Sequence, residues 1–158
     1  MSNGTYAKLV LNQESQNKIT AIATLINLEN YARPNDLHAT VIYSRYECSD
    51  VENIPVALPI KANGVSFEIF TNADKTNCLV LLLDSLEMQD LHEKCKIEYG
   101  ATHDYPSYKP HLTLSYDYPN GNRPSEEWIG YFNCLTFDQY VVVPLDIDQS
   151  AHEHEQEN

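Results

Sequence analysis

The sequence lacks the features that mark membrane-spanning, secreted and zinc-binding proteins. No apolar run reaches the ~18 residues that a membrane-spanning helix needs. Residues 1–4 do not form a basic region followed by an apolar core, so we expect no signal peptide. The four cysteines, at positions 48, 78, 95 and 134, form no C-x-x-C pair, which leaves a zinc or redox motif unsupported. We therefore expect reduced thiols, a cytoplasmic location and no contact with a membrane.

Positive charge is also scarce in this chain. Ten lysine and arginine residues stand against 23 aspartate and glutamate residues, which gives a net charge of −13. This balance argues against binding to long nucleic acids, because such binding relies on basic surface. A phosphate group would have to be held by a local site rather than by the overall field. A small, enclosed nucleotide fits that condition better than long RNA or DNA.

What the chain does have is enough material for one domain with a sizeable core. It contains 158 residues, of which 42% are hydrophobic. We predict a single domain over residues 1–148 and a monomer. Residues 149–158 are polar and acidic, and we predict that they form a disordered tail.

The most informative pattern is a six-position motif that occurs twice. His38 and Thr40 belong to H-A-T-V-I-Y, and His111 and Thr113 belong to H-L-T-L-S-Y. Both copies alternate polar and apolar side chains, which predicts half-buried strands. Positions i and i+2 of a strand share a face, so each histidine points the same way as its threonine. If the two strands lie side by side, two imidazoles and two hydroxyls converge on one cleft.

Two facing histidines suit general acid–base chemistry near neutral pH. Cleavage of a phosphodiester next to a ribose 2′-hydroxyl needs a neutral histidine to take the 2′ proton and a protonated one to give a proton to the leaving 5′ oxygen. The threonine hydroxyls can donate to the phosphate oxygens, where charge builds in the transition state. This scheme uses no metal and no cofactor, and it leaves open which histidine is the base. A single H-x-T would favour a satisfied core histidine, but the matched pair favours catalysis.

On these motifs the sequence resembles the two-histidine phosphoesterase superfamily, whose members carry one H-x-[ST] motif in each half of a pseudo-symmetric chain. The resemblance implies an α+β fold with two pseudo-symmetric lobes of mainly antiparallel sheet, flanking helices and a central groove. Within the superfamily, residues 4–6 (G-T-Y), the run L-H-A-T-V-I-Y-S-R and the ending V-V-V-P-L-D are similar to the phage anti-CBASS cyclic-oligonucleotide phosphodiesterases.

That resemblance implies a metal-independent hydrolase that cleaves 3′,5′ bonds of cyclic di- or trinucleotide messengers such as cGAMP. Such an enzyme would counter CBASS antiviral signalling in the host cytoplasm. Two alternatives stay open. One is an enzyme of the same superfamily that acts on 2′,3′-cyclic phosphate RNA ends or on 2′,5′-oligoadenylate. The other is a non-catalytic sponge for cyclic nucleotides.

Five further residues are candidates for substrate binding. Tyr6 and Lys8 share one face of the first predicted strand, where Tyr6 would stack on a base and Lys8 would meet a phosphate; a solvated strand face is the alternative. Arg45 follows the first motif, at the expected mouth of the cleft. Tyr108 and Lys109 lead into the second motif, and for Tyr108 base stacking and packing against the body are equally open.

Local patterns predict the remaining elements. We expect strands at 5–11, 37–44, 59–62, 65–70, 78–83 and within 131–144, helices at 13–31 and 85–99, and a short capped helix from Ser125. Asn12 is the predicted cap of the first helix, and Pro34 its stop. Asn63-Gly64 is a strong turn signal. We expect residues 47–59 and 101–109 to be loops, and His92 to be solvated on the second helix.

Overall fold

The computed structural model describes residues 4–32, 37–72, 74–103, 107–119 and 122–145. The predicted tail, at residues 149–158, lies outside these described residues. In chain order the elements are β1 (Gly4–Leu11), α1 (Gln13–Leu25), β2 (His38–Ser44), η2 (Ser49–Asn53), β3 (Ile60–Thr71), β4 (Asn77–Asp84), α2 (Leu86–Tyr99), β5 (His111–Ser115), η3 (Glu126–Tyr131) and β6 (Leu135–Leu145).

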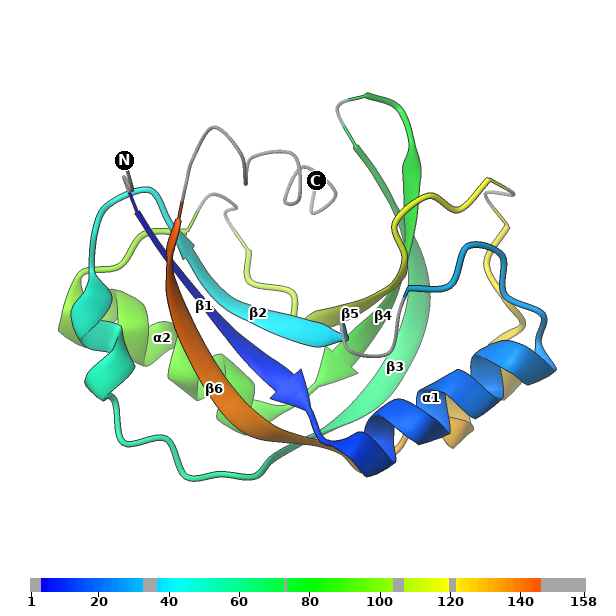
Figure 1. Cartoon of the computed structure of the whole chain (residues 1–158), viewed down its shortest axis with the longest axis horizontal. Helices are drawn as coiled ribbons and strands as arrows, with labels where there is room; N and C mark the ends of the chain where they lie inside the picture. The colour runs from blue at the N-terminus through cyan, green and yellow to red at the C-terminus, as the bar shows by residue number, and fades with distance from the viewer. Residues whose placement is uncertain (1–3, 33–36, 73, 104–106, 120–121, 146–158) are drawn as a thin grey trace.

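The six strands form one sheet in the order β2-β1-β6-β3-β4-β5, and every neighbouring pair is antiparallel. We call β2, β1 and β6 the first lobe and β3, β4 and β5 the second lobe. The two lobes join where β6 meets β3, through only three residue pairs: Ile60↔Phe137, Lys61↔Thr136 and Ala62↔Leu135. The sheet is curved, so that its two edge strands, β2 and β5, come together (Figure 1). The predicted α+β fold with two lobes is confirmed.

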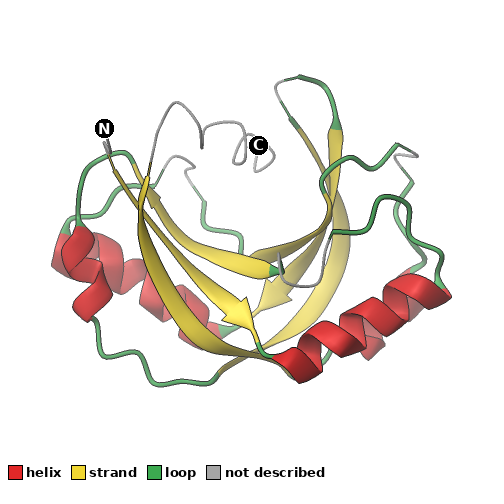
Figure 2. Ribbon diagram, in the orientation of Figure 1, coloured by secondary structure: helices red, strands yellow, loops and turns green. Residues whose placement is uncertain are grey.

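The main core lies on one face of this sheet, and the helices flank the sheet on the outside (Figure 2). Its largest fully buried aliphatic and aromatic side chains include Leu9, Ile42, Leu79, Leu81 and Phe137. Burial of such a side chain contributes about 1.5–3 kcal/mol. In β1, Ala7, Leu9 and Leu11 point into this core, as the alternating pattern predicts. Among the described residues, no helix is both long enough and apolar enough to cross a membrane.

Helix α1 begins as predicted but ends earlier. The side chain of Asn12 caps it by accepting a hydrogen bond from the Ser15 amide at 2.9 Å. The helix ends at Leu25 rather than near Pro34, because Asn27 adopts a left-handed conformation with φ of 54°. The amides of Asn27 and Leu28 then donate to Thr24 and Ala23, which is the bonding of a Schellman motif. Asparagine tolerates this conformation, and the sequence pattern did not reveal the stop.

Helix α2 follows the prediction at both ends. Ser85 caps it by accepting from the Met88 amide at 3.3 Å, and Gly100 ends it with φ of 71°. The prediction for His92 is wrong, because this side chain is only 2% exposed. Met88, Leu91 and Cys95 are buried beside it, so His92 belongs to the apolar stripe of the helix.

The predicted turn at Asn63-Gly64 is also wrong. Both residues lie inside β3, which joins the two short strands predicted on either side of them. The Gly64 amide donates to the Phe132 carbonyl at 2.7 Å, and a Cβ at this glycine would lie 2.8 Å from Cβ of Phe132. Glycine is therefore needed here for a close approach of two backbones rather than for a turn. The loop predicted at 47–59 contains one further element, η2.

Candidate active site

The two H-x-T motifs lie on the two edge strands of the sheet. His38 and Thr40 are in β2, and His111 and Thr113 are in β5. These strands come from opposite lobes and lie side by side at the centre of the molecule (Figure 1). The structure therefore brings together the two motifs that stand far apart in the sequence.

Strand register determines which residues share the face of the sheet that carries the motif side chains. In the first lobe Val10 lies opposite His38 and Lys8 opposite Thr40, and directly paired residues share a face. The Tyr6 hydroxyl lies 3.0 Å from Oγ1 of Thr40, in a buried hydrogen bond. Tyr6, Lys8, His38 and Thr40 thus belong to one surface, as the sequence pattern indicated.

Both motif strands break register directly after the threonine. In the first lobe Lys8 pairs with Thr40 and Ala7 with Ile42, so Val41 has no partner on β1. In the second lobe Val80 pairs with Thr113 and Leu79 with Ser115, so Leu114 has none on β4. β-Bulges are common beside active sites, because they redirect the strand and its side chains. Two bulges at equivalent positions show that the lobes repeat this local geometry, which side-chain alternation alone did not reveal.

His111 is a buried, neutral imidazole with one nitrogen anchored. Its side chain is 5% exposed, and its Nδ1 lies 2.7 Å from the Lys109 carbonyl. A carbonyl only accepts, so Nδ1 carries a proton and Nε2 is the nitrogen that titrates. Burial lowers the pKa of His111 from 6.5 to about 4, against the hydrogen bond to Lys109, which raises it. The positive charges of His38 and Lys109 lower this pKa further, so both lie within electrostatic reach of the ring.

His38 is more open to solvent than His111. Its side chain is half-buried, and its ring meets the edge of Tyr6 at a centroid distance of 6.3 Å. The phenol of Tyr6 therefore contacts both residues of the first motif. On the other side of the site, Phe70 packs edge-on against His111 at 5.3 Å. Sequence reasoning missed Phe70, because its place beside the second motif depends on the pairing of β3 with β4 and of β4 with β5.

The three predicted cations differ in placement. Lys8 is half-buried, with Nζ 6.0 Å from the centre of the Tyr6 ring. Lys109 is exposed, and its charge is felt at His111. Arg45 is exposed beyond the end of β2, and its Cζ lies 6.0 Å from the centre of the Tyr43 ring. Lys109 thus places positive charge near His111, and Lys8 lies beside Tyr6 and opposite Thr40, in a chain that is strongly acidic overall.

The sequence leaves two roles open for Tyr108, base stacking and packing against the body, and the structure shows packing. Its ring stacks on His92 at a centroid distance of 3.9 Å, and its hydroxyl donates to the Thr40 carbonyl at 2.7 Å. His103 lies edge-on to both rings, at 4.9 Å from His92 and 5.8 Å from Tyr108. Base stacking by Tyr108 stays untested. The sequence did contain a signal for His92, since Met88 and Cys95 at i−4 and i+3 are apolar.

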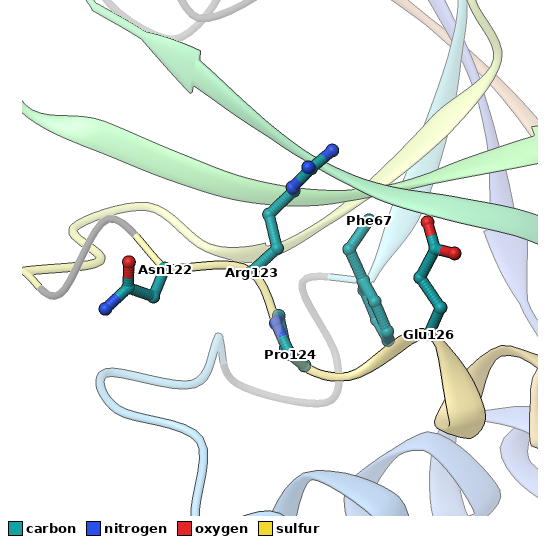
Figure 3. Close-up of a pocket in the computed structure, with 5 residues that line it drawn as sticks. All are labelled: Phe67, Asn122, Arg123, Pro124 and Glu126. Atoms are coloured by element: carbon teal, nitrogen blue, oxygen red, sulfur yellow. The ribbon is translucent and has the colours of Figure 1, made fainter.

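A separate hollow of about 450 Å³ lies between β3 and residues 122–126 (Figure 3). Its lining residues are Phe67, Asn122, Arg123, Pro124 and Glu126. Nη1 of Arg123 lies 3.6 Å from Oε2 of Glu68, so its cation already has a carboxylate nearby. None of the motif residues lines this hollow. Within the described part of the chain, no three His, Cys, Asp or Glu side chains are grouped closely enough to hold a metal ion.

The fold is a curved antiparallel sheet that brings the two H-x-T motifs together at its edges, as the resemblance to the two-histidine phosphoesterase superfamily implies. A known structure shares it: the crystal structure of E. coli LigT complexed with 3′-AMP has a TM-score of 0.53 to this chain. The likeness covers 92% of this chain and 97% of LigT at 12% sequence identity, which shows the fold alone.

The chain belongs to the Acb1 family of anti-CBASS proteins, whose family model matches residues 3–152. Anti-CBASS protein Acb1 of Vibrio phage KVP40 is 32% identical over 117 residues, which is 73% of this chain and 74% of the relative. The Acb1 protein of Acinetobacter phage Ac42 is 34% identical over 119 residues, which is 74% of this chain and 75% of the relative. The prediction of an anti-CBASS phosphodiesterase is thereby confirmed at the level of the family.

Proposed function

We propose that this chain is a metal-independent phosphodiesterase that opens 3′,5′ bonds of cyclic di- and trinucleotides such as cGAMP. The observation that carries the proposal is the placement of His38 on β2 and His111 on β5, the two edge strands that come together in space. Membership of the Acb1 family supplies the biological setting, which is the removal of CBASS messengers in the cytoplasm of an infected host. The chain would act as a monomer, without a membrane and without a long nucleic acid as partner.

The roles of the two histidines follow from their burial. His111 is neutral in the free protein at pH 7, so it is the base that takes the proton of the ribose 2′-hydroxyl at Nε2. A bound phosphate raises the low pKa of this imidazole, because its negative charge favours the protonated form. His38 is half-buried and is the acid that protonates the leaving 5′ oxygen. The 2′ oxygen bonds to phosphorus, and the bond from phosphorus to the 5′ oxygen breaks.

The product of this first step is a 2′,3′-cyclic phosphate and a free 5′-hydroxyl. In a second step the roles reverse: His38 takes a proton from water, which attacks phosphorus, and His111 returns its proton to the 2′ oxygen. A 3′-phosphate remains. The hydroxyls of Thr40 and Thr113 donate to the non-bridging phosphate oxygens in both steps. Tyr6 keeps the Thr40 hydroxyl in place through their 3.0 Å hydrogen bond.

Substrate binding falls to the cations and aromatic rings around the motifs. Lys8 and Lys109 meet the phosphates, because Lys8 pairs with Thr40 and Lys109 lies within electrostatic reach of His111. Tyr6 offers its ring to a base, and Arg45 meets the far side of the ring-shaped nucleotide. The short reach of these contacts suits a compact nucleotide, since the net charge of −13 repels a long polyanion.

The test compares a cyclic dinucleotide made of ribose with its deoxyribose counterpart in the presence of excess chelator. The ribose form is expected to be cut, with a 2′,3′-cyclic phosphate visible by mass spectrometry before the 3′-phosphate. The deoxyribose form is expected to bind but to stay intact, because the attacking oxygen is missing. Cutting of the deoxyribose form, or loss of activity with chelator, would contradict the mechanism. Binding of the ribose form without turnover would identify a sponge.

Matched substrates separate the remaining alternative. Short RNAs that end in a 2′,3′-cyclic phosphate and linear 2′,5′-oligoadenylate are run beside the cyclic dinucleotides at equal concentration. We expect kcat/KM to be highest for a cyclic 3′,5′-linked substrate. A preference for either linear substrate would keep the two-histidine chemistry and overturn the assigned substrate class.

A further inference from the structure

The stacked pair of His92, which is buried, and Tyr108, which is half-buried, lies outside the reaction described above. The pair nevertheless holds the first motif strand by hydrogen bonds at and after Thr40. Nδ1 of His92 lies 2.6 Å from the Val41 carbonyl, and the Tyr108 hydroxyl donates to the Thr40 carbonyl at 2.7 Å. A carbonyl only accepts, so Nδ1 of His92 is a donor. These two hydrogen bonds fix the two consecutive peptide groups that follow Thr40.

Strand β2 needs such partners because it is an edge strand with a bulge. Among the described residues only β1 pairs with it, so the backbone groups on its other edge have no neighbouring strand there. Buried backbone groups without partners are costly, and edge strands are commonly covered by other elements. Here the cover is made of side chains: the Tyr43 amide donates to Nδ1 of His103 at 3.2 Å, next to the bonds made by His92 and Tyr108.

In the second lobe, backbone groups rather than side chains support the outer edge of the motif strand β5. The Leu114 carbonyl follows the equivalent bulge, and it accepts from the Ala32 amide at 2.8 Å. Tyr31 adds a bridge to Ser115 of the same edge. The segment that leads into each motif strand thus supports the outer edge of the other motif strand. The difference is that each hydrogen bond that supports β2 can be removed by changing one side chain, whereas the backbone hydrogen bond that supports β5 cannot.

We propose that His92 is a positioning residue for the first motif, which acts through the Val41 carbonyl and through its stack on Tyr108 to aim the Thr40 hydroxyl at the phosphate. This inference rests on the proposed function for its readout and extends it to a residue without substrate contact. The stack is close to parallel, with an interplanar angle of 6°, so the histidine ring also sets the place of the tyrosine hydroxyl. A shift of the Thr40 peptide by a fraction of an ångström changes transition-state geometry before it changes the fold.

Two variants divide the contributions of His92. His92→Phe keeps an aromatic ring for Tyr108 and loses the donor to Val41. His92→Asn keeps a donor near the place of Nδ1 and loses the ring. We expect kcat to fall about tenfold in His92→Phe with KM little changed, and part of this loss to be restored in His92→Asn. Met88→Ala is the matched control, because Met88 is equally buried on α2 but belongs to the main core. It is expected to lower Tm and to keep kcat within about twofold below its melting temperature.

The decisive measurement is a pair of double-mutant cycles. In a Thr40→Ala background His92→Phe should cost less than about threefold in kcat, because the hydroxyl that it aims is gone. In a Thr113→Ala background it should cost the full tenfold, since that hydroxyl belongs to the other lobe. Equal losses in all backgrounds, together with a fall in Tm like that of Met88→Ala, would overturn the proposal and leave His92 a structural residue. If His92→Phe does not fold, Tyr108→Phe removes the hydrogen bond to the Thr40 carbonyl instead and is tested by the same cycles.

A readout without substrate separates this inference from the proposed function. Hydrogen exchange at the amides of Thr40, Val41 and Ile42 is measured by NMR in the wild-type chain and in His92→Phe. Faster exchange confined to β2 supports the positioning role of His92. If the wild-type chain also cuts no cyclic nucleotide, the proposed function alone is refuted. Unchanged exchange in β2 would refute the positioning role of His92, whether or not the chain cleaves cyclic nucleotides.

Discussion

At the scale of single residues, the proposed mechanism gives His38 and His111 opposite acid and base roles in each step, so both imidazoles are needed. We expect His38→Ala and His111→Ala each to lower kcat by about 10³-fold or more. Residues that act as a unit give non-additive losses, so the double variant should be little slower than either single variant. Single-turnover kinetics with a cyclic dinucleotide checks this, with circular dichroism to confirm the fold. Near-normal turnover by either single variant would rule out the pair mechanism.

The threonines are expected to matter less than the histidines. Thr40→Ala and Thr113→Ala each remove one hydroxyl donor to the developing phosphate charge, a loss of roughly 3 kcal/mol in transition-state stabilisation. The loss should appear in kcat rather than in KM. Thr40→Ser and Thr113→Ser are the matched controls, because they keep the hydroxyl, and they should retain most of the activity. If both alanine variants turn over like the wild-type chain, the hydroxyls do not face the phosphate.

Residues differ in how much of their role the sequence reveals. The H-x-T pairs are predictable because chemistry and strand periodicity coincide in a six-residue pattern that occurs twice. Tyr6 is predictable as a neighbour of the site because alternation in β1 decides its face. His92 was missed because charged neighbours on α2 hid its position on the apolar stripe. Its contact with Val41 joins residues 51 positions apart, and no local pattern encodes that distance.

At the scale of elements, caps were predictable and backbone irregularities were not. Asn12 and Ser85 cap their helices with their side chains, and Gly100 ends α2 because glycine readily adopts the left-handed conformation. The end of α1 was missed because a left-handed asparagine stops a helix without proline. The bulges at Val41 and Leu114 were missed because alternation continues in the sequence while pairing in space shifts by one residue. They depend on the partner strand, which the sequence does not name.

The glycine inside β3 offers a test of this element-scale account. Gly64→Ala places a methyl group 2.8 Å from Cβ of Phe132 and 3.2 Å from its carbonyl oxygen, so β3 and the end of η3 must move apart. We expect the free energy of unfolding to fall by about 1–3 kcal/mol, as for other overpacked sites. Gly130→Ala is the control, because an added Cβ there meets no atom within 4 Å. Urea denaturation of both variants measures the difference, and equal stability would contradict the close approach.

At the scale of the whole molecule, the buried imidazoles of His92 and His111 and the half-buried imidazole of His103 are expected to make the fold sensitive to acid. Burial lowers the pKa of His111 to about 4 and of His103 to about 3, and it lowers the pKa of His92, although the bond to Val41 opposes the last shift. The unfolded chain binds these protons near pH 6.5. Below that pH the unfolded state holds more protons than the folded state, so stability falls as pH falls from 6.5 toward 4.

The expected slope is about 1.4 kcal/mol per pH unit for each proton that only the unfolded state binds. Between pH 6.5 and pH 5 most carboxylates remain ionised, so the histidines dominate this window. Urea denaturation at half-unit steps of pH measures the slope. His92→Phe removes one of the three groups, and its slope should be smaller than that of the wild-type chain. A stability that stays constant across this window would show that the three imidazoles take up protons as readily in the folded state as in the unfolded state.

The order of the strands also decides when each half of the site can form during synthesis. β3, β4 and β5 follow one another over residues 60–115, so the lobe of His111 is complete in the emerging chain. The lobe of His38 waits for β6, which is made last and inserts between β1 and β3. Until then β1 exposes an unpaired edge, and this contact of long sequence separation is slow to close. A released chain truncated before residue 135 should therefore hold the second motif in place and leave the first unfinished, so that cleavage is expected only when the last strand is present.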